Sequence, residues 1–268
     1  EILIGLVGSE MCIRDSYQAI TGKRVSDKDN LYYIAERLYT EDDFTVSTNA
    51  NGLKTYKLRS EIPQPTLSGL LGPGDIKYTD VNGDGIIDSY DRVRGIGHPE
   101  TPEIIYGFGL NAEYKGIYAS IFFQGAGNTS VLLGGKTSEG WYPFSWGVDQ
   151  SNYRTFALNR WTENNPSQDV IIPRLHKNNA NNANNRVAST WWLRDGSFLR
   201  LKNIEIGYQI PKKFLSKIGF EAARIYLMGY NLAVWDHIKY FDPEAGNANA
   251  GLNYPLPRTY TIGLDFTF

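Results

Sequence analysis

The chain is poor in cysteine, has no basic cluster and lacks any long apolar run. Its 268 residues include one cysteine, Cys12, which excludes a disulfide framework. The formal net charge is −2, and this balance gives no reason to expect a nucleic-acid partner. No stretch approaches the roughly 18 apolar residues that a transmembrane helix needs. Membrane-spanning strands are still compatible with the sequence, because each needs only about 9 to 11 residues, half of which face water.

Glycine and aromatic residues are abundant instead, with 27 Gly and 18 Tyr. Near the end of the chain, apolar residues alternate with small or polar ones, and a period of two places them on opposite faces of a strand. The apolar set there is Tyr260, Ile262, Leu264, Phe266 and Phe268. Two other stretches repeat the alternation, with apolar sets Tyr106, Phe108, Leu110, Ala112 and Tyr114, and Ile204, Ile206, Tyr208 and Ile210.

The opposite faces of these strands carry mostly Gly, Asn, Glu, Gln, Thr and Asp. These residues are too small and polar to form half of a dry core. A lipid-facing exterior and a hydrated lumen explain both faces, as in an outer-membrane β-barrel. An alternative from another class stays open: a secreted, calcium-dependent carbohydrate-binding β-sandwich, in which the apolar faces would pack against a second sheet.

The predicted fold class is therefore all-β and antiparallel, with the strands in residues 104–268 and an extracellular loop region at 17–103. The expected strands are 104–114, 117–127, 198–210, 222–235 and 257–268. In the fourth of these, one face is expected to carry Tyr226, Met228, Tyr230, Leu232 and Val234. We also expect a short helix over 149–161 and one or two helical turns within 211–219.

The connections between these strands alternate in length. Lys115-Gly116 and residues 211–219 form short turns, whereas 128–196 and 236–256 are long. Bacterial barrels show this asymmetry between periplasmic turns and extracellular loops. Five strands cannot close, and an open sheet edge in lipid is forbidden, so we expect further strands upstream in the parent protein.

The N-terminal segment is set aside in this prediction of the fold. Residues 1–16 contain LVGSEMCIRDS, which looks like the in-frame translation of a transposase adapter used in sequencing libraries. We interpret this segment as an artefact, so Cys12 is not considered as a nucleophile or a redox site.

The sharpest local motif is DVNGDGIIDSYD, residues 80–91. Its spacing is that of a 12-residue calcium loop, with Gly85 at the sharp turn. The expected Ca²⁺ ligands are Asp80, Asn82, Asp84, the Ile86 carbonyl, Asp88 and Asp91. Two features depart from the EF-hand: the last position is Asp rather than Glu, and no amphipathic helices flank the loop. The competing interpretation is an Asp/Asn/Gly turn without a metal.

Several motifs together resemble the C-terminal part of the SusC/RagA family of TonB-dependent outer-membrane transporters. They are GDIKYTDVNGDGIID, PEIIYGFGLNAEYKG, NRWTENNP, LRDGSFLRLKNIEIGYQIPKKF, YLMGYNL and RTYTIGLDFTF. The resemblance runs from about residue 33 to the end of the chain. It implies a large barrel of about 22 strands with a plugged lumen in the cell outer membrane.

The resemblance also implies partners and a function. Members of the family import oligosaccharide or peptide fragments through a plug that TonB opens, beneath a SusD-like surface lipoprotein. The plug and the TonB box are not found in this sequence. The family further implies that the final aromatic residue, Phe268, is recognised by the barrel-assembly machinery, and that the wall contacts outer-membrane lipid.

We expect binding rather than catalysis. Trp141, Tyr142 and Trp146 are low-ranked candidates for stacking on sugar rings, because aromatic residues more often anchor loop packing or the membrane interface. The three histidines have no metal-ligand spacing, and we expect His98, His176 and His237 to be surface residues. No nucleophile elbow or glycosidase-type carboxylate pair is identified.

Overall fold

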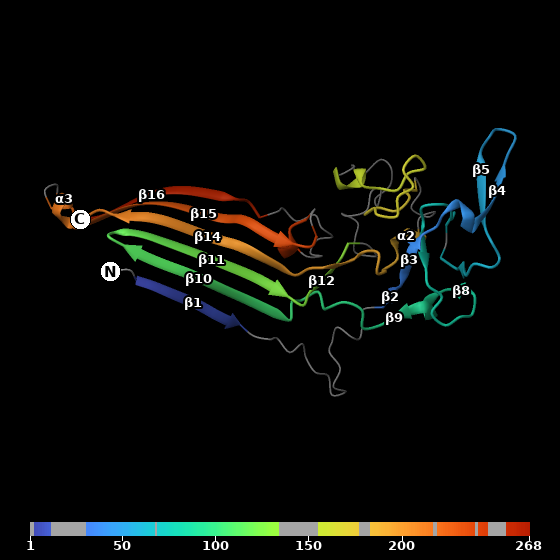
Figure 1. Cartoon of the computed structure of the whole chain (residues 1–268), viewed down its shortest axis with the longest axis horizontal. Helices are drawn as coiled ribbons and strands as arrows, with labels where there is room; N and C mark the ends of the chain where they lie inside the picture. Colours follow the sequence, from blue (N-terminus) through green and yellow to red (C-terminus); the bar gives the residue numbers. More distant parts are fainter. Residues whose placement is uncertain are drawn as a thin grey trace, which may run out of the picture.

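The computed structural model describes residues 3–11, 31–67, 69–133, 155–176, 183–216, 219–238, 241–245 and 256–268. The protein has two parts: a sheet of long strands at one end and a region of packed loops at the other (Figure 1). The described helices are short, and none is long and apolar enough to cross a membrane.

The long strands form one six-stranded antiparallel sheet in the order β1-β10-β11-β14-β15-β16. Its members are β1 (Leu3–Met11), β10 (Ile104–Tyr114), β11 (Ile117–Gly127), β14 (Phe198–Gln209), β15 (Ala222–Asp236) and β16 (Thr259–Thr267). The backbone of β1 pairs with β10, although β1 lies in the segment set aside above. This pairing does not test the origin of residues 1–16, which stays a prediction.

The five expected strands are all present, and their ends differ from expectation by at most two residues. The β10–β11 turn is tight because Lys115 and Gly116 have φ of 51° and 83°, as a two-residue hairpin turn requires. β16 begins at Thr259 rather than at Pro257, which has no N–H to donate to the sheet. The all-β antiparallel prediction is confirmed.

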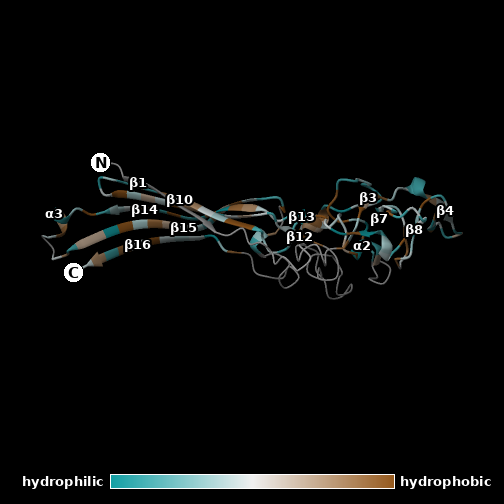
Figure 2. Cartoon of the chain, turned by 90° about the horizontal axis from the view of Figure 1, so that it is seen from below, coloured by the Kyte–Doolittle hydropathy of each residue, from teal (hydrophilic) through white to brown (hydrophobic). Residues whose placement is uncertain are grey.

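One face of the sheet is apolar and uncovered. Figure 2 shows the sheet as a single curved layer. Tyr260 and Ile262 are each 75% exposed, and Ile206 is 51% exposed. No second sheet packs on this face in the described part of the chain. The described residues do not show the covered apolar face that the β-sandwich alternative requires.

The opposite face is polar and is packed by rings lying over glycines. Tyr118 pairs with Gly207, and Tyr226 pairs with Gly263 on the neighbouring strand. A Cβ added to either glycine would overlap the tyrosine ring. Glycine at these two positions therefore leaves room for the tyrosine ring of the neighbouring strand. The ring packs over the glycine backbone and supplies the side-chain contact that glycine itself cannot make.

The register of β15 confirms that Tyr226, Met228 and Tyr230 share a face and shows which face it is. They pair with Gly263, Thr261 and Thr259 on the polar side. The apolar side of β15 is formed by Ile225 and Leu227. These two residues pair with Leu264 and Ile262, and all four are exposed.

The loop region is built from short paired strands rather than irregular chain. The pairs are β2 (Tyr32–Tyr33) with β9 (Arg92–Val93), β3 (Ala35–Leu38) with β7 (Ile76–Tyr78), β4 (Phe44–Thr48) with β5 (Lys54–Leu58), β6 (Gln64–Pro65) with β8 (Ile86–Ile87), and β12 (Ser130–Leu132) with β13 (Leu193–Asp195). Its core contains fully buried side chains, among them Leu38, Ile76, Ile172 and Trp192.

The helical elements are brief. They are η1 (Glu41–Asp43), η2 (Ser89–Asp91), η3 (Thr155–Leu158), α2 (Ala183–Arg186), α3 (Lys212–Leu215) and η5 (Pro243–Ala245). Of the helix expected over 149–161, the described residues contain only η3, and the chain from Asn159 onward is not helical. The helical turn expected after Pro211 is present as α3.

Candidate ligand pocket in the loop region

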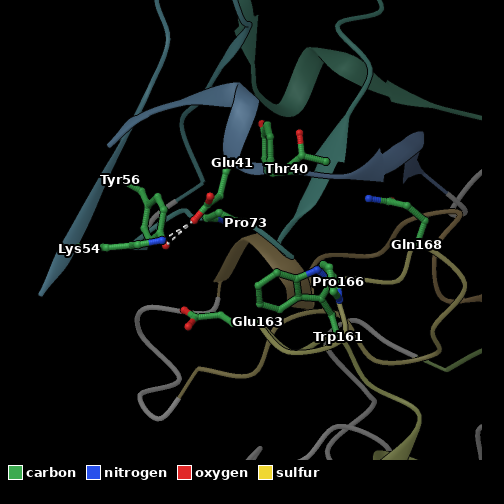
Figure 3. A pocket seen from close by; sticks show the side chains of 10 residues that line it. Thr40, Glu41, Lys54, Tyr56, Pro73, Trp161, Glu163, Pro166 and Gln168 are labelled. Atoms are coloured by element: carbon green, nitrogen blue, oxygen red, sulfur yellow. Dashed lines mark hydrogen bonds and ion pairs between the residues drawn. The ribbon is translucent and has the colours of Figure 1, made fainter. Parts of the chain in front are cut away.

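A pocket of about 520 Å³ lies at the end of the loop region away from the long sheet. Such a volume is typical of small-ligand sites, which span about 300 to 1,000 Å³. It lies between the β4–β5 hairpin and the segment from Trp161 to Gln168 (Figure 3). The lining residues are Tyr39, Thr40, Glu41, Lys54, Tyr56, Pro73, Trp161, Glu163, Pro166 and Gln168.

The hairpin side of the pocket is fixed by η1. Asp43 accepts hydrogen bonds from both terminal nitrogens of Arg37, each 2.7 Å long, and from the Thr40 amide. Phe44 packs between the rings of Tyr39 and Tyr56, with centroids 5.5 and 5.8 Å away. These contacts hold Glu41, Lys54 and Tyr56 on one wall.

The opposite wall is fixed by two contacts across the chain. The Gln168 amide accepts from the Leu38 N–H at 2.8 Å and donates to the Leu38 carbonyl, as a neighbouring strand would. Trp161 lies against Gly74, where a Cβ would overlap the indole ring. Gly74 also has φ of 89°, a conformation that residues with a side chain rarely adopt.

The pocket contains one neutralised carboxylate and one free carboxylate. Glu41 accepts from the Lys54 ammonium at 2.8 Å, and this bond lowers the pKa of Glu41 and raises the pKa of Lys54. Glu163 lies across the pocket from this pair, on the same side as Trp161 (Figure 3). Glu163 has no hydrogen bond or ion pair to any residue that the structure describes.

A buried polar cluster underlies the loop core and corrects the prediction for His176. The Nε2 atom of His176 lies 2.6 Å from Asp75 Oδ1, and His176 is only 9% exposed. Asp75 also accepts from the Asn185 amide and from the Gly72 N–H, both at 2.8 Å. His176 is therefore a structural residue, whereas the side chains of His98 and His237 are 47% and 67% exposed, as expected.

The 80–91 loop has the turn geometry that the motif predicts, with φ of 77° at Gly83 and 81° at Gly85. Its side-chain oxygens bind the loop backbone. Asp80 accepts from the Gly83 and Gly85 amides at 2.7 and 2.8 Å. The buried Asp91 accepts from the Val81 and Asp88 amides, both at 2.8 Å. These bonds by themselves account for a turn without a metal.

The calcium fit is only partial. Asp84 accepts from the Ile86 amide and the Asn82 side chain, and Asp88 accepts from the Tyr90 amide. Within the described residues, no group of three or more His, Cys, Asp or Glu side chains is arranged to hold a metal ion. The oxygen-rich composition suits Ca²⁺, but the side chains are not converged on one point, and calcium stays a prediction.

A second cavity, of about 480 Å³, lies where the sheet meets the loops. It is lined by Gln124 on the polar side of the sheet and by Glu244 from the β15–β16 connection. Arg200 of β14 is 3% exposed and pairs with both Asp242 and Glu244. This buried ion cluster fixes the described part of the connection over the end of the sheet.

Comparison with known proteins gives a consistent match, although no protein-family model matches the chain. TonB-dependent receptor P26 of Formosa agariphila is 34% identical over 249 residues, which cover 87% of this chain and 23% of the relative. TonB-dependent receptor P3 of the same organism is 33% identical, over 76% of this chain and 20% of the relative. The chain belongs to the TonB-dependent receptors. It spans about a fifth of the length of these curated relatives.

Solved structures show the same architecture. The RagAB peptide transporter is 27% identical, with a TM-score of 0.54, over 73% of this chain and 21% of that chain. The RagAB peptide importer in its closed-closed state has a TM-score of 0.56 at 23% identity, over 89% of this chain and 23% of that chain, and supports the fold alone. The resemblance to SusC/RagA proteins is confirmed.

The β-barrel fold and the outer-membrane location follow from family membership. The apolar face of the sheet is then predicted to contact lipid. The matched proteins are receptors and transporters, in agreement with the expectation that the chain is not an enzyme. Phe268 lies beside Phe220, with ring centroids 4.9 Å apart, and its role in barrel assembly stays a prediction. Trp141, Tyr142 and Trp146 lie outside the described residues.

Sequence reasoning missed the pocket entirely. Its lining comes from four separated stretches, 39–41, 54–56, 73 and 161–168. Two of them adjoin motifs that carried the family resemblance, since Gly74 opens GDIKYTD and Trp161 lies in NRWTENNP. The presence of these motifs indicated importance, but only the fold shows that they contact each other.

Proposed function

We propose that this chain forms part of a TonB-dependent outer-membrane importer of oligosaccharide or peptide fragments, working with a SusD-like surface lipoprotein. The observation that carries the proposal is the single-layer sheet, apolar on one face and polar on the other, in a chain that matches TonB-dependent receptors over 87% of its length. The fold neighbours named as peptide transporters support import rather than signalling alone.

The sheet supplies the barrel wall in this proposal. On the polar face, Arg224 pairs with Asp265 at 2.6 Å, and Tyr118 donates to Glu205 at 2.8 Å, so four adjacent strands are tied together by hydrophilic contacts. A hydrated lumen stabilises such groups, whereas lipid would not. The loop region, anchored by Arg200 and by the Asp75 cluster, would then form part of the extracellular mouth.

Uptake by the complete receptor tests this proposal. Cells that express the receptor and its lipoprotein should accumulate a fluorescently labelled oligosaccharide or peptide, and the accumulation should stop when TonB is deleted. Labelled fragments of both classes should be offered in parallel, because the sheet does not distinguish them. Equal accumulation with and without TonB would refute active import.

The lipoprotein partner requires a separate experiment. An affinity tag on the receptor should retain a surface lipoprotein in mild detergent, identified by mass spectrometry. Retention of none, under conditions in which the receptor stays folded and binds substrate, would refute the two-component arrangement while leaving TonB-dependent import intact.

A further inference from the structure

We propose that the pocket between the β4–β5 hairpin and the 161–168 segment binds one or two neutral sugar units at the outer surface of the receptor. The pocket is lined only by residues of the loop region, and none of the long strands of the sheet contributes to it. In the proposed function it would lie at the extracellular mouth, outside the barrel lumen. Its biological setting rests on the proposed function, but the binding chemistry depends only on the residues that line it.

The side chains of Lys54 and Glu163 are exposed at the pocket and suit a ligand group that both donates and accepts. The Lys54 ammonium has three donors, and the structure uses one of them on Glu41. The Glu163 carboxylate accepts only, and in the described chain it has no hydrogen-bond partner. A hydroxyl can donate to Glu163 and accept from Lys54 at the same time. A sugar presents several such hydroxyls on one rigid ring.

The charges disfavour ionic ligands of either sign. Glu41 pairs with Lys54, whereas Glu163 interacts with Lys54 only through its charge, so the three groups together carry one net negative charge. An acidic sugar or a sulfate group would be repelled by Glu163. A lysine or arginine side chain would be attracted by Glu163, but it would have to approach the Lys54 ammonium that already occupies the opposite wall (Figure 3). A neutral polyol avoids both repulsions.

The remaining lining is apolar and rigid. Trp161 and Tyr39 are 8% and 2% exposed, and they are held by the contacts with Gly74 and Phe44. Pro73 and Pro166 add further apolar surface. Because Trp161 and Tyr39 are almost fully covered by the protein, they form a rigid base, and the apolar contact to the C–H face of a pyranose ring would come from the half-buried Tyr56 and the exposed Pro166.

Isothermal titration calorimetry on the complete receptor in detergent tests the proposal. The probes are neutral tetrasaccharides: maltotetraose, cellotetraose, laminaritetraose, mannotetraose and galactotetraose. At least one should bind, and Lys54→Met and Glu163→Gln should each weaken it roughly tenfold or more, since each removes a hydrogen bond to a charged group. Lys57→Met is the matched control, because Lys57 lies on the same strand but outside the pocket, and it should leave the affinity unchanged.

Three outcomes would overturn the inference. They are no binding of any probe, equal weakening by the pocket variants and by Lys57→Met, or tighter binding of tetralysine or tetragalacturonate than of every neutral probe. The uptake experiment above separates this inference from the proposed function. TonB-dependent uptake in the native receptor, together with unchanged sugar affinity in Lys54→Met and Glu163→Gln, would refute the pocket alone.

Discussion

Replacing Ile262 by arginine tests which face of the sheet contacts lipid. Ile262 lies near the middle of β16, is 75% exposed and pairs with Leu227, which is 56% exposed. Arginine on the lipid face of a barrel costs about 2 to 4 kcal/mol near the bilayer midplane. That range is about a 30- to 700-fold loss in the folding equilibrium.

Thr261→Arg provides the matched control. Thr261 is the neighbouring residue on the same strand, but it pairs with Met228 on the polar face. An arginine there enters a hydrated environment, so we expect little change in stability. Both variants introduce the same charged side chain at nearly the same depth, so the comparison reports mainly on the environment of each face.

The assay is urea-titrated folding of the complete receptor into phosphatidylcholine vesicles, followed by the gel shift between unfolded and folded barrels. Ile262→Arg should lower the urea midpoint of the folded form, and Thr261→Arg should not. Equal midpoints for the two variants would refute the assignment of the apolar face to lipid, as would a larger loss in Thr261→Arg.

Four further predictions concern packing, pH, calcium and the backbone of the 80–91 loop. Gly207→Ala should destabilise the barrel by about 1 to 3 kcal/mol, because the added Cβ overlaps the Tyr118 ring. Combining it with Tyr118→Ala should remove part of this cost. If the two changes are simply additive in the double-mutant cycle, the contact is contradicted. Burial raises the pKa of Asp43, but hydrogen bonds from Arg37 and Thr40 outweigh the effect of burial and lower the pKa below 3.8. The ionised Asp43 therefore stabilises the folded state above pH 3.8, and this stabilisation is lost as the pH falls through the lowered pKa. After correction for intrinsic exchange rates, the β4–β5 amides should therefore lose protection as the pH falls below 3.8 in the native receptor but change less with pH in Asp43→Asn, and identical pH profiles would contradict this. If the 80–91 loop binds Ca²⁺, calorimetry should detect binding that Asp84→Ala abolishes; no heat above buffer, with unchanged stability of Asp84→Ala, would remove the metal. Asp91→Ala should destabilise the loop with or without Ca²⁺, because the amides of Val81 and Asp88 lose their buried acceptor, at a cost of about 1 to 3 kcal/mol each. Unchanged protection of these two amides in hydrogen exchange would contradict this prediction.

The strands of the sheet were predictable from the sequence because local rules agree there. β10 and β11 begin and end at the expected residues, since the alternation of aromatic residues and glycine defines the faces and Lys115-Gly116 supplies a hairpin turn. The faces of β15 were harder to assign, because large apolar residues occupy both. Tyr226 and Met228 compete with Ile225 and Leu227, and only the register with β16 decides between the two faces.

The loop region was not predictable because its contacts join distant residues. His176 has no neighbour in sequence that suggests burial, and its partner Asp75 lies 101 residues away. Side chains in this region replace the regular hydrogen bonds that strands provide. The Gln168 amide, for example, binds both backbone groups of Leu38, which is 130 residues away. Such pairing has no periodicity that a sequence pattern could reveal.

The pocket shows why the family motifs gave more information about fold than about function. Gly74 and Trp161 belong to different motifs, and the absence of a Cβ at Gly74 is what allows the indole ring to form a wall of the pocket. Of the residues that give the pocket its chemistry, Glu41 and Lys54 lie outside the motifs, on η1 and β5, whereas Glu163 lies in the same motif as Trp161. Outward side chains on the β4–β5 hairpin can change without disturbing the packing of Trp161 on Gly74. Ligand choice can therefore vary at the hairpin wall while the opposite wall stays constant.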